Sequence, residues 1–285
     1  MRSFVSDYDL VIAKTLPDAL ELLDANEGWR PIAGGTDLMV LFNAGKLPFR
    51  RLVSIRDIAV LRRIETAEDH VAIGAAVTYT DVRMNPVLQS EFPLLCQAAS
   101  WVGGIANQNR GTLGGNIANA SPAADSSPML LAYDAELELI SRSGTRLVPY
   151  FEFHLGYKVM QLRTDELITR IRLPRPRRLR SQYARKVGTR KAQAISKVCL
   201  AAVAERDQGA LRNVRLAAGS VAPIPLRCRQ TEKVLDDVRL TPAVVQEAKE
   251  TIAREIRPIT DIRSTAQYRA RVTMNLLGEF LESLL

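Results

Sequence analysis

Apolar residues recur with two different spacings along the first part of this 285-residue chain. A helical spacing predicts a helix over residues 15–25, with Thr15 as its cap, and further helices over residues 92–101 and 125–133. Shorter apolar runs predict strands, two of which form a hairpin around residues 142–144. The predicted strands cover residues 30–33, 51–55, 70–75, 135–140, 145–149 and 167–173. Helices and strands therefore alternate here, which is typical of α/β structure.

A different order follows residues 174–176, Pro-Arg-Pro, which together with the basic residues after them predict a domain boundary. Strands come first and helices afterwards, and one helix begins with Thr241 as its cap and Pro242 in its first turn. The predicted elements are strands over residues 182–187, 198–206 and 211–219 and helices over residues 241–255 and 266–285. This order predicts a small antiparallel sheet covered by helices. We expect one domain over residues 1–175 and a second over residues 178–285.

Residues 110–125, RGTLGGNIANASPAAD, gather small residues without resembling a flexible linker. Gly114 and Gly115 have no Cβ, so they can take positive φ and let a ligand approach the backbone closely. Hydroxyl, amide and carboxylate groups surround them, a mixture that suits a ligand with phosphate and ribityl parts. These polar side chains belong to Thr112, Asn116, Ser121 and Asp125. A pair of tight turns in a β-rich region is the alternative interpretation.

Residues 31–38, PIAGGTDL, repeat this theme, because an apolar strand-like run enters two glycines before an amphipathic segment begins. The pattern predicts a strand, a glycine loop and a helix, where free N–H groups at the helix start would favour a diphosphate. Asp37 could equally serve only as the helix N-cap. Neither glycine segment has the spacing of a Rossmann fingerprint or a P-loop.

The formal net charge of +8 is concentrated in residues 170–197, which contain eleven lysines and arginines and no acid. Several of these cations alternate with apolar residues as in a strand, and no aromatic platform accompanies them. A solvated strand face or a surface for an acidic partner is therefore favoured over nucleic-acid binding. No apolar run approaches the length of a membrane helix and no export signal is visible, so a cytoplasmic location is expected.

Cysteines and histidines offer little material for catalysis or metal binding. Cys96, Cys199 and Cys228 lie far apart and in no ligand spacing, which disfavours disulfides and an internal iron–sulfur cluster. His70 and His154 are the only histidines, too few for a zinc site rich in histidine. We expect His70 in an exposed turn and His154 partly buried with a backbone partner. The sequence nominates no catalytic acid or base and no metal ligand.

The two glycine segments lie about 75 residues apart, and the basic segment RKVGTRKAQAISKV follows at residues 185–198. With Trp101 and the terminal helices, they resemble the FAD-binding (medium) subunit of the xanthine dehydrogenase and carbon monoxide dehydrogenase family of molybdenum hydroxylases. The resemblance covers essentially the whole chain. It implies an α+β protein with a PCMH-type FAD-binding domain, as in vanillyl-alcohol oxidase, followed by the C-terminal domain of CO dehydrogenase flavoproteins. The first domain would consist of two α/β subdomains that meet near residues 55–60.

Non-covalently bound FAD is expected between these subdomains, and the family pattern assigns its contacts. The diphosphate and ribityl chain would contact Ile32, Ala33, Gly34, Gly35, Thr36, Asp37, Leu38, Thr112, Leu113, Gly114, Gly115 and Asn116. Further cofactor contacts would come from Val102, Ser121, Asp125, Ile168 and Lys186. For Lys186, membership of the basic run without a role at the cofactor is the alternative. The loop at residues 190–198 would pass near the flavin.

The resemblance also implies partners, because a chain with FAD loops alone cannot hydroxylate a substrate. A large molybdopterin subunit would oxidise the substrate, and a small [2Fe–2S] subunit would relay electrons to FAD in this chain. The complex would be a heterotrimer, with a dimer of heterotrimers as one allowed arrangement. NAD, oxygen or another carrier would receive the electrons. Ala192, Gln193 and Ala194 are neutral where some relatives are acidic, so the sequence leaves these acceptors open. A stand-alone FAD-dependent oxidase of the vanillyl-alcohol type is the alternative function.

Overall fold

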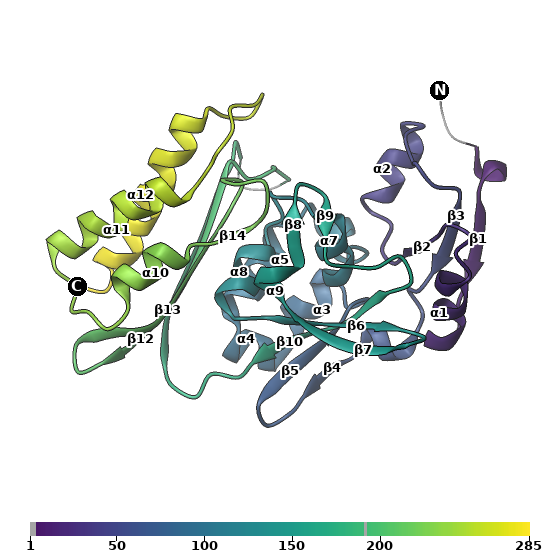
Figure 1. Cartoon of the computed structure of the whole chain (residues 1–285), viewed down its shortest axis with the longest axis horizontal. Helices are drawn as coiled ribbons and strands as arrows, with labels where there is room; N and C mark the ends of the chain where they lie inside the picture. Colours follow the sequence, from purple (N-terminus) through teal and green to yellow (C-terminus); the bar gives the residue numbers. More distant parts are fainter. Residues whose placement is uncertain (1–3, 191–192) are drawn as a thin grey trace.

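The computed structural model of the chain describes residues 4–190 and 193–285. The described residues form four β-sheets, and the three larger ones follow one another along the long axis, with the N-terminal sheet at one end and the C-terminal helices at the other (Figure 1). Helices lie beside every sheet, so the structure confirms the predicted α+β class.

The first sheet is parallel, with strand order β1-β3-β2. Thr15 begins helix α1 with a capping box, in which its side chain and that of Asp18 each accept from the other residue's backbone N–H. The predicted start of this helix is therefore confirmed. The elements are η1 (Val5–Asp7), β1 (Asp9–Ile12), α1 (Leu16–Asp24), β2 (Trp29–Ile32), α2 (Leu38–Asn43), β3 (Arg51–Ser54) and η2 (Ala59–Arg62).

The second sheet is antiparallel, with strand order β4-β5-β10-β6-β7. The predicted hairpin is present as β6 and β7, which meet where Ser141 pairs with Gly144. The strands are β4 (Ile64–Thr66), β5 (His70–Gly74), β6 (Glu136–Ser141), β7 (Gly144–Pro149) and β10 (Leu167–Pro174). The other elements are α3 (Tyr79–Met84), α4 (Pro86–Glu91), α5 (Pro93–Trp101), α6 (Ile105–Gln108), α7 (Leu113–Asn119), α8 (Ser127–Ala132), α9 (Tyr150–Phe153), β8 (His154–Gly156) and β9 (Val159–Met160).

The third sheet is antiparallel and runs in chain order from β11 to β14. Three helices follow it and lie on its outer side in Figure 1, as the strands-then-helices order predicts. Thr241 caps α11 by accepting from the N–H of Val244, with Pro242 in the first turn. The elements are β11 (Arg180–Val187), β12 (Val198–Asp207), β13 (Ala210–Gly219), β14 (Leu226–Arg227), α10 (Arg229–Leu235), α11 (Pro242–Glu255) and α12 (Ala266–Glu282).

Strand β12 is buried on both faces and joins the two large cores. Its residues Val198, Leu200, Ala202 and Ala204 pack with the C-terminal helices. The residues between them, Cys199, Ala201 and Val203, pack into the core of the second sheet. Because successive side chains of a strand point to opposite faces, the third sheet lies between its own helices and the rest of the protein.

The second glycine segment is partly helical, whereas the sequence indicated a loop or a pair of turns. After Thr112 it forms α7, where the Thr112 side chain accepts from the N–H of Gly115 as an N-cap. Helices α3, α4 and α6 were also not predicted, because segments of four to six residues give only a weak helical periodicity.

The basic run at residues 170–197 is largely neutralised within the chain. Glu138 of β6 accepts from both Arg170 and Arg172 of β10, and Arg175 makes two hydrogen bonds to Glu91. Farther along, Arg180 pairs with Glu205 and Arg185 with Glu279. Acids that are distant in sequence therefore offset a charge that looks uncompensated in sequence, which leaves less of it for an external partner than the run alone indicates.

Candidate functional site

The two glycine segments, far apart in sequence, lie in backbone contact. A Cβ on Gly34 would collide with the carbonyl oxygen of Arg110, and one on Gly111 would lie 3.4 Å from the Thr36 hydroxyl. Gly34 therefore serves the approach of the two segments, which only a residue without a side chain permits. Residues 33–37 are called loop 1 below, and residues 110–112 with the first turn of α7 are called loop 2.

Loop 1 presents a row of unused backbone donors. Within the described residues, no hydrogen bond is donated by the N–H groups of Gly34, Gly35, Thr36 and Asp37. Gly35 has φ +73°, a conformation that side chains disfavour. Asp37 occupies the N-cap position of α2, yet its side chain makes no capping hydrogen bond. The simple N-cap interpretation of Asp37 therefore does not hold.

The backbone N–H groups of loop 2 from Leu113 to Asn116 already have acceptors within the chain. The N–H groups of Leu113 and Gly114 bond to Val77 and Ala75, and those of Gly115 and Asn116 bond to Thr112. Neither glycine has positive φ among the described backbone angles. A Cβ on Gly114 would lie 2.6 Å from that of Ala75, so this glycine allows α7 to pack on the chain after β5. Close packing, rather than free N–H groups, is what loop 2 contributes.

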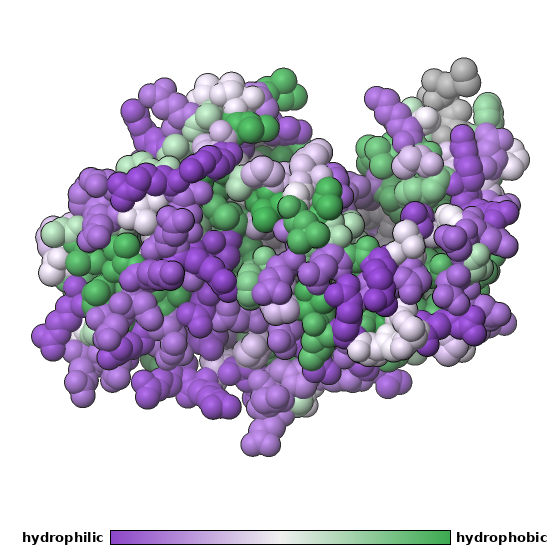
Figure 2. All heavy atoms as spheres, in the orientation of Figure 1, coloured by the Kyte–Doolittle hydropathy of each residue, from purple (hydrophilic) through white to green (hydrophobic). Residues whose placement is uncertain are grey.

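Between the lobe that carries α2 and the rest of the protein, the surface is hollowed in Figure 2. Loop 1 leads into α2 on one side, and α7 with the β8–β9 hairpin lies on the other (Figure 1). Lys158 of this hairpin donates to the side-chain and backbone oxygens of Asn119 at the end of α7. Burial lowers the pKa of Lys158, and the carboxylate of Asp37 opposes this shift. This hollow between α2 on one side and α7 with the β8–β9 hairpin on the other is called the notch below. Both glycine segments border it.

Beside loop 2, Asp125 and Lys186 form a buried ion pair at 2.6 Å that joins the first part of the chain to β11. Ser196 also donates to the Asp125 carboxylate, and Lys186 donates to the Trp101 carbonyl at 3.2 Å. Burial raises the pKa of Asp125, whereas the Lys186 ammonium and the Ser196 hydroxyl oppose the rise. Sequence reasoning did not single out Ser196, because a lone serine in a loop carries no spacing signal.

The other residues predicted to contact the cofactor lie at several places around loop 2 and the second sheet. Asn116 accepts from Ser126, and Ser121 accepts from the N–H of Ala123. Ile168 is buried at an irregular point of the β10–β6 pairing, and Val102 follows the last residue of α5. Gln193 has positive φ and its amide approaches Gly104, whereas Ala192 lies outside the described residues.

Two known families match the chain in succession. The family described as FAD binding domain in molybdopterin dehydrogenase matches residues 6–176, and CO dehydrogenase flavoprotein C-terminal domain matches residues 183–284. The chain belongs to the FAD-binding subunits of the molybdenum hydroxylases. The predicted family is thereby confirmed, FAD is the cofactor of this subunit, and the protein is part of an oxidoreductase.

Similarity to individual relatives extends over nearly the whole FAD-binding subunit. It is 34% identical to the putative xanthine dehydrogenase FAD-binding subunit of Escherichia coli, over 93% of this chain and 91% of that one. It is 30% identical to the glyceraldehyde dehydrogenase medium chain of Sulfolobus acidocaldarius, over 93% and 94%. A chain of carbon monoxide dehydrogenase from Hydrogenophaga pseudoflava superposes with TM-score 0.93 at 27% identity, covering 97% and 96%.

Other features of the FAD-binding subunit concern metals and membranes. Among the described residues, no group of three or more His, Cys, Asp or Glu side chains could hold a metal ion. His154 is buried with the Ile117 carbonyl 3.2 Å from its Nε2, which confirms the predicted backbone partner. The prediction of an exposed turn for His70 is wrong, because His70 begins β5, is only partly exposed and pairs with Asp69. No helix in the described ranges combines the length and apolar character that crossing a membrane requires.

Proposed function

We propose that FAD lies in the notch, with its diphosphate at loop 1. The observation that supports this placement is the row of four N–H groups, Gly34 to Asp37, which donate to no described residue. Successive free N–H groups form a concave donor surface that favours a phosphate without a cation. Ile32, Ala33 and Leu38 flank this row, so the proposal retains the whole set from Ile32 to Leu38.

Loop 2 is proposed to form the opposite wall. Its donors from Leu113 to Asn116 are used internally, so its contribution is a rigid surface rather than phosphate hydrogen bonds. Asn116 accepts through its amide oxygen, which leaves the amide nitrogen available to a ribityl hydroxyl. The other proposed contacts are Val102, Thr112, Gly114, Gly115, Ser121, Asp125, Ile168 and Lys186.

The Asp125–Lys186 pair is proposed to fix the relative position of the two domains at the cofactor. We place these domains at residues 1–175 and 178–285, with the subdomain boundary near 55–60. The pair is about nine-tenths buried on both side chains, so its geometry is held by protein rather than by water. When bound, FAD supplies a ring that takes up and releases electrons, and the surrounding residues orient this ring and limit its access to solvent.

We further propose a place for the chain in a complex. Electrons would arrive from [2Fe–2S] clusters of a small partner subunit, after a large molybdopterin subunit has oxidised the substrate, and would leave to NAD or another acceptor. The medium-chain names of the relatives from Sulfolobus and Hydrogenophaga favour this arrangement. A cytoplasmic heterotrimer, or a dimer of heterotrimers, is the assembly that we propose.

The cofactor assignment is tested by titrating the purified chain with FAD and following flavin fluorescence and thermal unfolding. We expect saturable binding, and an increase in unfolding free energy of about 2.7 kcal/mol when free FAD reaches one hundred times its Kd. A folded chain that shows no flavin absorbance and retains no added FAD would contradict the assignment.

The complex is tested by affinity purification of the tagged chain from its native cells. Molybdenum, iron and flavin are then measured in the purified material by mass spectrometry and absorbance. We expect all three, together with a large chain and a cysteine-rich small chain. Recovery of the chain alone, with oxidase activity toward a small alcohol, would instead support the stand-alone oxidase.

A further inference from the structure

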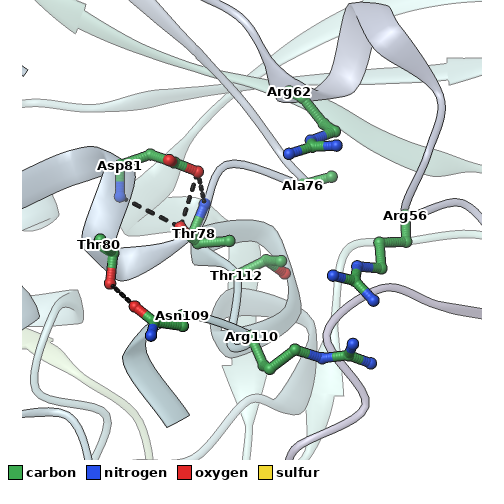
Figure 3. A pocket seen from close by; sticks show the side chains of 9 residues that line it. All are labelled: Arg56, Arg62, Ala76, Thr78, Thr80, Asp81, Asn109, Arg110 and Thr112. Atoms are coloured by element: carbon green, nitrogen blue, oxygen red, sulfur yellow. Dashed lines mark hydrogen bonds between the residues drawn. The ribbon is translucent and has the colours of Figure 1, made fainter. Parts of the chain in front are cut away.

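A polar cavity of about 240 Å³ lies where the connection between the first two sheets meets loop 2. Arg56 follows β3, Arg62 ends η2 and Arg110 precedes α7, and all three line it. Figure 3 shows the three side chains coming from different segments, with the heads of Arg56 and Arg110 near each other and that of Arg62 on the side of Ala76 and Thr78. Three guanidinium groups around one small cavity repel one another unless an anion lies between them.

These arginines lack the partners that neutralise most of the basic run. Within residues 4–190 and 193–285, the side chains of Arg56, Arg62 and Arg110 make no hydrogen bond or ion pair with another described residue. By contrast, Arg170 and Arg175 each pair with glutamates. The cationic groups of the cavity therefore remain available to a ligand.

One acid also lines the cavity, but it is already engaged. Asp81 accepts from both the backbone N–H and the hydroxyl of Thr78 through the same carboxylate oxygen, as part of the α3 capping box. Three guanidinium groups and one carboxylate leave a net formal charge of two positive units. The charge of the cavity thus matches a phosphate or diphosphate group rather than a neutral or cationic ligand.

Neutral donors complete this surface. Thr112 is 4% exposed, and its hydroxyl oxygen accepts from Gly115 while its proton has no acceptor among the described residues. Asn109 accepts from Thr80 through its amide oxygen, so its two N–H groups stay free for a ligand oxygen. Guanidinium, hydroxyl and amide donors around a cavity of this size form the surface that phosphate oxygens require.

We propose that Arg56, Arg62 and Arg110 form a phosphate-binding site at this cavity, and that its occupant is a phosphate of FAD. The identity of the occupant rests on the proposed FAD site, because Gly34 of loop 1 touches the Arg110 backbone and so places the cavity beside the unused N–H row. Side-chain cations then add to the backbone donors of loop 1 in holding the diphosphate. A free inorganic phosphate is the other source of the same chemistry.

The test compares Arg62→Gln and Arg56→Gln with Arg63→Gln in the full chain. Arg63 carries the same charge one residue farther along and does not line the cavity. Affinities for FAD and for riboflavin, which lacks phosphate, are measured by fluorescence, and those for inorganic pyrophosphate and ADP by calorimetry. Thermal unfolding of each variant verifies that it folds.

We expect wild type and Arg63→Gln to bind pyrophosphate and ADP in competition with FAD. Arg62→Gln and Arg56→Gln each lose roughly tenfold in affinity for FAD, ADP and pyrophosphate, with riboflavin affinity unchanged. If pyrophosphate binding falls in these variants while FAD affinity does not, the phosphate site stands and a free anion, not the cofactor, is its occupant.

Two outcomes distinguish failure of the phosphate site from failure of the FAD assignment. If wild type binds FAD but neither pyrophosphate nor ADP, and the arginine variants bind FAD as wild type does, the phosphate site is overturned and the FAD assignment stands. If wild type binds no FAD yet binds pyrophosphate in a manner that depends on Arg62, the FAD assignment fails while the phosphate site stands.

Discussion

The buried Asp125–Lys186 ion pair contributes both to stability and to the proposed cofactor site. Replacing Lys186 by Met would leave the Asp125 carboxylate buried with only Ser196 as a donor. We expect Lys186→Met to lower the unfolding free energy by about 3–5 kcal/mol near neutral pH, because an uncompensated charge then remains buried. Chemical denaturation followed by circular dichroism measures this loss. Flavin affinity should fall in parallel.

The pH dependence of the unfolding free energy of Lys186→Met tests whether its Asp125 carboxylate is unpaired. Burial raises the pKa of Asp125 in the folded chain, and loss of Lys186 removes the charge that opposes this rise. The folded variant therefore binds a proton more readily than the unfolded chain, so its unfolding free energy should increase as the pH is lowered from neutral toward the ordinary pKa of an aspartate. Asp125→Asn in the Lys186→Met background should abolish this dependence. A flat profile in the single variant would argue against an unpaired carboxylate.

Gly34 and Gly35 are neighbours with different physical roles. A Cβ at Gly34 meets the Arg110 backbone, whereas one at Gly35 has space but an unfavourable φ of +73°. We expect Gly34→Ala to abolish FAD retention by separating the loops, and Gly35→Ala to cost only about 1 kcal/mol of stability. Flavin content after purification and denaturant midpoints distinguish the two variants. Equal losses in both would mean that the contact between the loops does not organise the site.

Strands β6 and β10 are joined by a buried carboxylate as well as by backbone pairing. Glu138 accepts from Arg170, Arg172 and the Thr169 hydroxyl. We predict that Glu138→Ala lowers the unfolding free energy by about 1–3 kcal/mol, since Arg172 loses its carboxylate acceptor, whereas Thr169 keeps the backbone carbonyl of residue 138 and Arg170 keeps Glu65. Glu65→Ala is the matched control, because Glu65 is half exposed and 3.5 Å from Arg170, and should cost less than about 1 kcal/mol. Similar midpoints in urea for both variants would refute this role of Glu138.

Longer elements were predictable from sequence because their signals are local. Thr15 and Thr241 cap the helices that they were expected to cap, and β12 appears as a continuous apolar run. Helix α7 was not predicted, because its two glycines have poor helical propensity and its support comes from Ala75, distant in sequence. Strand β1 was missed as well, since all four of its residues are exposed at a sheet edge and show no alternation.

Residues of the candidate site were predictable from sequence only where they belong to a recognisable motif. Asp125 was singled out as a polar residue of the second glycine segment and Lys186 by the family resemblance, and no local pattern indicates that they pair across 61 residues. Arg56 and Arg62 lie in a short connection without any motif, so only the fold brings them beside Arg110. For the basic run at residues 170–197, the positive charge is evident from the sequence, but the acidic residues that neutralise it are identified only by the fold.

At the scale of the whole molecule, the third sheet depends on both of its neighbours. Its face with Cys199, Ala201, Val203 and Ala217 is buried against the core of the second sheet, and its other face is buried under the C-terminal helices. Residues 178–285 expressed alone would therefore expose an apolar sheet face to water. The proposed domain boundary marks a change of fold type, and it does not imply that either part is stable by itself.

We predict that the isolated segment 178–285 self-associates and binds a hydrophobic dye, whereas the full chain does neither. Light scattering coupled to size exclusion and dye fluorescence measure both properties at matched concentrations. Ala201→Asp in the isolated segment should reduce association, because a charge then lies on the newly exposed face. The same substitution in the full chain should be strongly destabilising, because Ala201 is fully buried there. A monomeric segment that unfolds cooperatively without dye binding would show that the third sheet is stable without the core of the second.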